Sequence, residues 1–254
     1  MELDFTLTQY LLIGILGIVA GIINMMAGGG SNLILPVLMM FGIPADIANG
    51  TNRVGVLLQS VSGLQGFYKA GKLPTADLPA IMLPTLIGGI IGALAASFAP
   101  VSILKPMLLL TMLGVAALVA FRPDLLVHAP DVRPVRVADR PQSRWALAAV
   151  GIYGGFVQAA AGFVLLPVLA GMLCYDLVRA NALKVCCTLG FTLVALAIFI
   201  SRGQVMWDIG LVLAICSALG ARIGVKTAIK LQPDTLRKIL FAMTLIAVVL
   251  ALLK

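Results

Sequence analysis

The sequence has little charge and few of the side chains that soluble enzymes use. Of its 254 residues, 11% are charged and 61% are hydrophobic. A soluble domain needs far more charge to cover its surface, so the composition excludes that class. There is one histidine, and the few acidic residues form neither a dyad nor a metal-ligand spacing. We therefore expect a protein that is not an enzyme and that has no cofactor or metal.

The cysteines and the net charge also indicate no special chemistry. The four cysteines lie in apolar sequence without metal-ligand spacing, which predicts small packing residues. The net charge of +8 does not indicate a nucleic-acid partner, because most Lys and Arg lie in short segments between apolar runs. Cations in such positions set the topology of a membrane protein.

Apolar runs recur from one end of the sequence to the other. A transmembrane helix needs about 20 apolar residues, and about eight to ten full or shorter segments can be distinguished. They lie near residues 7–27, 33–41, 44–68, 79–98 and 101–120, and near residues 145–160, 163–174, 177–200, 206–225 and 236–253. The sequence therefore predicts an all-α polytopic membrane protein.

The two halves of the sequence are versions of one another. Pro36 aligns with Pro167, and Arg53 aligns with Lys184 at the same offset. A register that holds across the half indicates internal duplication. We predict a first transmembrane repeat at 1–120, a cytoplasmic linker at 121–144 and a second transmembrane repeat at 145–254.

Each half contains a hydrophobic segment that small residues interrupt, at 27–32 and at 160–163. A broken helix frees backbone groups that lipid cannot satisfy, so the break must face protein or a water-filled cavity. The helix that restarts points N–H groups and a positive dipole end toward the break, and Ser31 and Asn32 suit its N-cap. The repeated break predicts an anion site. Close helix packing on the glycines is the alternative.

The distribution of Lys and Arg predicts the orientation of the halves. If the chain turns at each break and returns to its starting side, nearly all cations outside the membrane fall on one side. The exceptions are Lys105, Arg202 and Lys254. If each break lies within one continuous span, the cations divide far more evenly. The positive-inside rule favours the turn, with inverted repeats, both termini outside, and partial penetration by 33–41 and 163–174.

Two cations lie at membrane depth. Arg53 is about nine residues into the segment that begins near Pro44, or about 13 Å deep at 1.5 Å per residue. A charge at that depth costs several kcal/mol unless it faces a cavity or a partner. Lys184 occupies the matching position. We expect the two cations to bind the anion as a pair, and interfacial anchoring is the alternative.

The predicted substrate-binding residues surround the breaks and the two cations. They are Asn24, Gly28, Gly29, Gly30, Ser31, Asn32, Asn49, Thr51, Asn52, Arg53, Gln158, Ala161, Gly162, Asn181 and Lys184. Asn24 and Gln158 precede the breaks and would donate to a ligand or bond the freed carbonyls. Asp46 and Asp176 begin corresponding segments, where acidic residues stabilise a helix start. A proton-carrying role is the alternative for these two acids.

A family resemblance follows from these motifs. The run Ala-Gly-Gly-Gly-Ser-Asn-Leu-Ile-Leu-Pro-Val-Leu, with Phe-Gly-Ile-Pro-Ala-Asp-Ile-Ala-Asn-Gly-Thr-Asn-Arg after it, resembles the TauE/SafE sulfite exporter family, also called the TSUP permeases. The second copy is weaker and reads Ala-Ala-Gly-Phe at 160–163. The resemblance implies a bacterial inner-membrane location and movement of sulfite, sulfonates, sulfoacetate or related anions. It also implies that residues 28–32, residues 49–53 and their second-half counterparts line the path.

We therefore expect a secondary transporter that moves a small organosulfur or sulfur oxyanion by alternating access. An anion or water channel is the alternative, but a channel needs a continuous polar lining, whereas polarity here is concentrated at two repeated points. A membrane-embedded enzyme or assembly factor would need ionisable pairs that face a cavity. The sequence leaves open the particular anion, the direction of transport, coupling to protons or sodium, and the oligomeric state.

Overall fold

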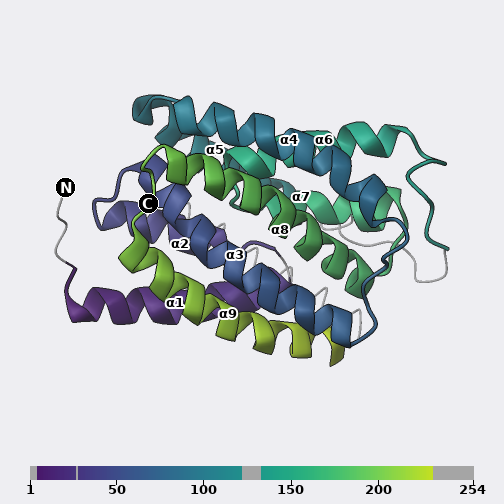
Figure 1. The fold of residues 1–254 in the computed structure, drawn as a ribbon, viewed down its shortest axis with the longest axis horizontal. Helices are drawn as coiled ribbons and strands as arrows, with labels where there is room; N and C mark the ends of the chain where they lie inside the picture. Colours follow the sequence, from purple (N-terminus) through teal and green to yellow (C-terminus); the bar gives the residue numbers. More distant parts are fainter. Residues whose placement is uncertain (1–4, 27, 122–132, 231–254) are drawn as a thin grey trace.

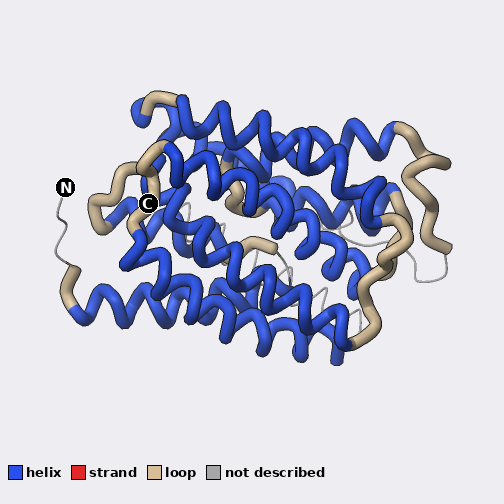
Figure 2. The backbone as a smooth tube through the Cα atoms, in the orientation of Figure 1, coloured by secondary structure: helices blue, strands red, loops and turns tan. Residues whose placement is uncertain are grey.

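The computed structural model describes residues 5–26, 28–121 and 133–230, and these residues form helices and no strand (Figure 2). The helices are α1 (Leu7–Met26), α2 (Ser31–Met40), α3 (Ala45–Lys69), α4 (Leu78–Phe98), α5 (Val101–Phe121), α6 (Gln142–Phe156), α7 (Ala161–Leu166), the π-helix η2 (Pro167–Met172), α8 (Leu177–Ser201) and α9 (Trp207–Lys230). The predicted segment 236–253 and residues 122–132 of the predicted linker lie outside the described residues.

Four of the described helices are long and apolar enough to cross a membrane: α1, α4, α8 and α9. Leu and Ile side chains are exposed along all four. Helix α3 has 25 residues, as α8 has, but it carries a series of buried polar side chains. Its exposed large apolar side chains are Leu58, Val61 and Tyr68. The protein is an all-helical polytopic membrane protein, as its composition predicts.

The order in which the long helices pack on one another is unchanged when the two halves are exchanged (Figure 1). Helix α1 packs on α9, α9 on α3, α3 on α8, α8 on α4, and α4 on α6. Helices α1, α3 and α4 correspond in sequence to α6, α8 and α9. Exchanging the halves therefore reverses the order and reproduces it, as expected for inverted repeats.

The two outer helix pairs use glycine in matching positions. A side chain on Gly21 of α1 would collide with the Ser217 carbonyl of α9, and one on Gly151 of α6 would collide with the Thr85 carbonyl of α4. Small residues let helix backbones approach closely inside a membrane. Each outer pair joins one helix from each half, so these glycines interlock the two repeats.

The chain turns at each break and returns toward the end of the bundle from which it came. The Phe41 ring, just after α2, lies 6.1 Å from the ring of Phe5, which precedes α1. In the second half, Leu173 after η2 accepts a hydrogen bond from the backbone of Val135, which precedes α6. Helix α2 has 10 residues, which span about 15 Å, half of the hydrocarbon core. This is the turn that the Lys and Arg distribution favours.

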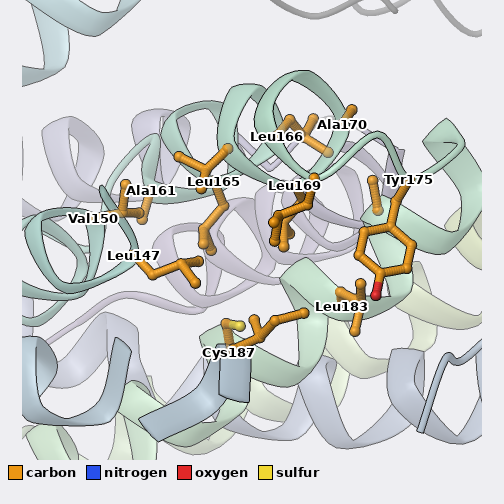
Figure 3. Packing of buried hydrophobic residues seen from close by; sticks show 14 of the residues in the cluster. Leu147, Val150, Ala161, Leu165, Leu166, Leu169, Ala170, Tyr175, Leu183 and Cys187 are labelled. Carbon is orange, nitrogen blue, oxygen red and sulfur yellow. The ribbon is translucent and has the colours of Figure 1, made fainter. Parts of the chain in front are cut away.

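A hydrophobic cluster fixes the second turn against α8. Leu165 of α7 and Leu169 of η2 point toward Leu183 and Cys187 of α8 (Figure 3). Leu183 and Cys187 flank Lys184 in the sequence, so the cluster positions the helical turn that carries this cation. Two of the free cysteines are buried in packing, as predicted, and Cys174 and Cys216 are only partly buried.

Candidate functional site

The two helix breaks contact each other through glycine. A side chain on Gly28 would collide with the Cα of Gly162, and one on Gly162 would collide with the Cα of Gly28. Gly28 also has a φ of 97°, a conformation that other residues rarely adopt. Gly29 lies against the Phe163 ring and Gly30 against the backbone of α1. Close packing thus accounts for Gly29 and Gly30, which face protein rather than open space.

The second break adopts left-handed backbone without glycine. Gln158 has a φ of 64° and Ala160 a φ of 56°. Such a conformation costs a non-glycine residue about 1–2 kcal/mol. Helix α7 follows with only 6 residues before Pro167 begins the π-helix. The surrounding structure, rather than local preference, therefore holds this break in place.

The start of α2 differs from the sequence prediction. Gly30 is the N-cap without a side-chain cap bond, and Ser31 and Asn32 already lie in the first turn. Instead, Asn24 Oδ1 of α1 accepts the Gly30 N–H at 3.0 Å. The Ser31 hydroxyl accepts a hydrogen bond from Asn52 Nδ2 of α3 at 3.1 Å. The predicted N-cap was wrong because a side chain from another helix takes over the role of the local cap.

The Arg53 guanidinium lies at the C-terminal end of α6. It is fully buried, and its two terminal nitrogens donate to Gln158 Oε1 and to the backbone carbonyls of Gly154, Gly155 and Phe156. The last carbonyls of a helix lack intrahelical partners and carry the negative dipole end, so a cation stabilises them. These bonds occupy the four terminal N–H groups, and Nε has no partner.

Lys184 makes the corresponding contact in the other direction. Its Nζ donates to the Asn24 carbonyl near the end of α1 at 2.8 Å and to Asn181 Oδ1 at 2.6 Å. Each cation thus binds the end of the broken helix of the opposite repeat. An ammonium group has three N–H donors. The two bonds of Lys184 use two of them.

Two adjoining cavities lie beside the breaks. The first is lined by polar side chains that include Asn24, Ser31, Gln59, Gln158 and Lys184. Its free volume of about 10 Å³ has room for about one water molecule. The second cavity shares Asn24, Ser31 and Gln59 with the first. Lys184 is the one charged side chain among the described residues that line either cavity.

Comparison with known proteins places this architecture in a family. The family model described as Sulfite exporter TauE/SafE matches residues 13–251. The chain belongs to the TauE/SafE sulfite exporter family. Its membership agrees with the resemblance of the 27–53 motif.

Relatives of this TauE/SafE chain are named as transporters. The "Probable membrane transporter protein" of Haemophilus influenzae is 28% identical over 210 residues, which cover 83% of this chain and 81% of that protein. The "Probable membrane transporter protein ORF9" of Sinorhizobium is 25% identical over 228 residues, with 89% and 85% covered. The "Probable membrane transporter protein YfcA" of Escherichia coli is 28% identical over 217 residues, with 84% and 80% covered. At the level of the family, this protein is a membrane transporter.

The structure brings some of the predicted residues to the cavities of this TauE/SafE protein and leaves others elsewhere. Those that line the first cavity are Asn24, Gly28, Ser31, Gln158, Ala161, Gly162 and Lys184, and Asn52 lines the second. Those that line neither are Gly29, Gly30, Asn32, Asn49, Thr51, Arg53 and Asn181. Asn49 donates to the Phe156 carbonyl at 2.9 Å, and Thr51 Oγ1 accepts the Met206 N–H at 2.9 Å. These two side chains join helices.

Several lining residues fall outside the predicted set. Gln59 and Ser60 of α3 and Thr188 of α8 line the first cavity. Thr188 lies one turn beyond Lys184, and Gln59 two turns beyond Asn52, so helical spacing was the available signal. Ser217 of α9 lines the second cavity. No pattern in the sequence distinguishes it.

The two acidic residues of the TauE/SafE repeat behave differently. Asp176 caps α8, because its Oδ1 accepts the N–H groups of Val178 and Arg179 at 3.1 and 3.0 Å. Asp46 lies in the first turn of α3, whose N-cap is Pro44 without a side-chain cap bond. The Asp46 carboxylate instead contacts the connection between α8 and α9.

Proposed function

We propose that this protein is a secondary transporter that moves a small sulfur oxyanion or organosulfur anion, such as sulfite, a sulfonate or sulfoacetate, by alternating access. The observation that carries the proposal is Lys184, a buried cation at the wall of the first cavity, whose two hydrogen bonds to protein leave one N–H group for a ligand. The described residues that line the cavity include no carboxylate. The fixed positive charge therefore favours an anionic ligand.

A second donor in the first cavity supports an anion as the ligand. Ser60 Oγ, at the wall of this cavity, is buried without a hydrogen-bond partner. A buried donor without an acceptor costs about 1–3 kcal/mol, which the oxygen of a ligand would offset. Gln158 lies between Arg53 and the cavity, since its Oε1 accepts from Arg53. Arg53 then acts on the site through Gln158 rather than by touching the ligand.

The closed cavity favours alternating access. A free volume of about 10 Å³ is too small for a polyatomic anion, since one water molecule already needs this much. The helices must therefore separate before the anion enters. Inverted repeats supply a way to do so on either side in turn, because each half can adopt the conformation of the other. A channel would need a continuous polar path.

Counterflow in proteoliposomes tests the proposal. Vesicles that contain the purified protein are loaded with unlabelled sulfite and diluted into radiolabelled sulfite, and the same is done with sulfoacetate and taurine. A carrier gives transient, saturable accumulation of label for at least one of these anions. Linear flux that does not saturate would indicate the channel instead, and no flux for any anion would overturn the proposed function.

The proposed orientation places the basic end of the bundle in the cytoplasm. The loops before α4, α6 and α8 meet at this end, where Tyr175 donates to Asp77 at 2.6 Å and Arg140 to the Met172 carbonyl at 2.9 Å. Its described cations are Lys69, Lys72, Arg133, Arg136, Arg140, Arg144, Arg179, Lys226 and Lys230, and those of the opposite end are Lys105 and Arg202. The positive-inside rule then directs the start of α1 outward.

Cysteine labelling in intact cells tests this orientation. Arg136 and Lys105 are exposed at opposite ends of the bundle. In a cysteine-free background, an impermeant reagent should label Lys105→Cys in intact cells and Arg136→Cys only after permeabilisation. The opposite labelling pattern would reverse the orientation.

A further inference from the structure

The two cavities share part of one wall, and their other walls differ in charge. The side chains that line both cavities are Asn24, Ser31, Val56 and Gln59. Beyond this shared wall, the first cavity extends to Lys184 of α8, whereas the second extends between α1, α2, α3 and α9. Among the described residues that line the second cavity, none is charged.

The first cavity supplies the groups that bind one anionic head. The Lys184 ammonium has an N–H group beyond its two hydrogen bonds to protein, and the Ser60 hydroxyl is buried without a partner. The nearby Arg53 does not line either cavity, and its terminal nitrogens donate to Gln158 and to the carbonyls at the end of α6. The cavity walls therefore provide a partner for a single negative charge.

The second cavity supplies neutral groups. Its polar side chains are amides and hydroxyls, namely those of Asn24, Ser31, Asn52, Gln59 and Ser217. Asn52 Nδ2 donates to Ser31 Oγ at 3.1 Å, and Ser217 Oγ donates to the Gly55 carbonyl at 3.0 Å. Ile34 contributes an apolar part of the wall. A charged group in this cavity would be buried without a counter-ion, which costs far more than burial of a methyl or hydroxyl group.

The matching positions of the second half are filled by apolar side chains. At the offset that relates the two repeats, Ile34 corresponds to Leu165. Asn52 corresponds to Leu183 in the same way. Both leucines pack in the hydrophobic cluster against α8 (Figure 3). The neutral cavity thus belongs to the first half and Lys184 to the second, so a ligand that fills both cavities is charged at one end only.

The two cavities follow one another along α3. Asn52 and Gly55 line the second cavity, Ser60 lines the first, and Val56 lines both. Val56 and Ser60 are one helical turn apart, or about 6 Å at 1.5 Å per residue. A two- or three-carbon chain with its terminal group has a similar length. Each cavity has a free volume of about 10 Å³, so head and tail enter as the helices separate.

We propose that the two cavities form one binding site, in which the first takes a sulfonate head and the second takes a short uncharged tail. The substrate class is then a monoanionic alkanesulfonate or hydroxyalkanesulfonate. This inference deepens the proposed function and rests on it. It also predicts discrimination against a zwitterion such as taurine and a dianion such as sulfoacetate, because neither second charge would have a counter-ion.

A series of sulfonates with the same head and different tails tests the proposal. The tails of 1-propanesulfonate and 2-hydroxyethanesulfonate are uncharged, whereas taurine ends in an ammonium and sulfoacetate in a carboxylate. Isothermal titration of the purified wild-type protein should give the two uncharged tails dissociation constants lower by about tenfold or more. Methanesulfonate, which lacks the tail, should also bind about tenfold more weakly than 1-propanesulfonate, because two buried CH₂ groups are lost.

Asn52→Asp should reverse the preference, because it places a carboxylate at the second cavity with little change of shape. The affinity for taurine relative to 2-hydroxyethanesulfonate should rise by about tenfold or more, and sulfoacetate should bind still more weakly. Gln65→Glu is the matched control, since it makes the same amide-to-carboxylate change at an exposed position of α3. This control should keep the wild-type order of affinities.

Ile34→Val keeps the location of the tail testable if Asn52→Asp does not fold. Removal of one CH₂ group from the wall of the second cavity should favour a longer tail. The affinity for 1-butanesulfonate relative to 1-propanesulfonate should rise about fourfold, as expected for one more buried CH₂ group. Leu165→Val is the control, because the corresponding leucine packs in the hydrophobic cluster and lines neither cavity. Its ratio should match that of wild type.

Equal affinities for all the tails in wild type would show that the second cavity holds water rather than part of the ligand, and would overturn the inference. Wild-type affinity ratios in folded Asn52→Asp or in Ile34→Val would overturn the location of the tail. Sulfite counterflow alongside either result would leave the proposed function intact. If neither sulfite nor any sulfonate of the series binds or gives counterflow, the proposed function itself is overturned.

Discussion

The two cations that the repeats place in matching positions have different surroundings. The four terminal N–H groups of Arg53 donate to Gln158 and to the last carbonyls of α6. The Arg53 guanidinium carbon also lies 4.9 Å from the centre of the Phe199 ring. Lys184 makes two bonds, to the end of α1 and to Asn181, and lines the first cavity. Duplication thus supplied two matching positions: each cation holds the end of a broken helix, and Lys184 also lines the first cavity.

This difference shows that matching residues in the two repeats of a transporter can have different roles, one structural and one at the cavity. Inside a membrane, the carbonyls freed at a helix break must find a donor. A guanidinium has five donors and can serve several carbonyls at once, whereas an ammonium is a compact charge with three. The arginine therefore suits the structural position, and the lysine suits a position where a ligand would bind and be released. The following predictions test that division.

Arg53→Gln should have the largest effect, and on stability rather than on affinity alone. Removal of the guanidinium leaves the last carbonyls of α6 buried without donors. A buried acceptor that loses its donor costs about 1–3 kcal/mol. The free energy of unfolding, measured by SDS titration in mixed micelles, should fall by about that amount, and Arg53→Lys should recover part of it. Arg222→Gln, at an exposed position of α9, is the control and should unfold like wild type. Wild-type stability in Arg53→Gln would remove the distinction between the two cations.

Gly162→Val should abolish counterflow by separating the two halves at their breaks. The added side chain would collide with the backbone of Gly28, whereas Gly171 in η2 has open space around its Cα. Gly171→Val is therefore the matched control and should transport like wild type. Size-exclusion chromatography should show both proteins folded and monodisperse, since the packing of the long helices on one another is unchanged. Equal transport by the two variants would show that the contact between the breaks is dispensable.

Lys184→Gln should weaken anion binding without a comparable loss of stability. A charge-assisted hydrogen bond contributes about 1.5–3 kcal/mol, so the dissociation constant for sulfite should rise about ten- to a hundredfold. Lys226→Gln changes an exposed lysine of α9 and should bind like wild type. Isothermal titration of both purified variants makes the comparison. An unchanged affinity in Lys184→Gln would place the ligand away from the first cavity.

Ala160→Gly should have the smallest effect and should act in the stabilising direction. Ala160 has a φ of 56°, and glycine would relieve about 1 kcal/mol of strain there. The thermal midpoint of the purified protein should rise by a few degrees, while counterflow stays at the wild-type rate. Gly171→Ala serves as the control, because its backbone has no positive φ and little should change. A lower midpoint for Ala160→Gly would indicate that the alanine methyl group contributes packing that outweighs its strain.

The sequence predicted the elements that depend on local pattern. Apolar segment length, the aligned prolines and the small-residue interruptions predicted the broken helices, and 44–68 matches α3 (Ala45–Lys69) within a residue at each end. The N-cap at Ser31 was wrong, because the Asn24 side chain that replaces it comes from another helix. Asn24 lies six residues before Gly30 and was predicted to act at the break, but as a donor rather than as the acceptor of an N–H group.

Contacts with the opposite repeat also explain why the two predicted cations, Arg53 and Lys184, have different surroundings. Arg53 and Lys184 share one register in the sequence, which predicts equal roles. Their environments differ because Arg53 donates to three carbonyls at the end of α6, whereas Lys184 donates to one carbonyl at the end of α1. Those carbonyls belong to the opposite repeat, 101 to 103 residues from Arg53 and 160 residues from Lys184 in the chain. Periodicity within one segment cannot show which helix end a cation will meet.

The pairing of α1 with α9 also determines how long α1 lacks its packing partner while the protein is being synthesised. Helix α1 ends at Met26, and its glycine face packs on α9, which begins at Trp207. A ribosome adds about 5–20 residues each second, so α1 waits about ten to forty seconds in the bilayer for its partner. During that interval Gly21 and its neighbours are open to other helices and to membrane proteases. Slowed elongation after α1 should therefore lower the yield of this protein more than that of a bundle whose neighbouring helices are consecutive in the chain.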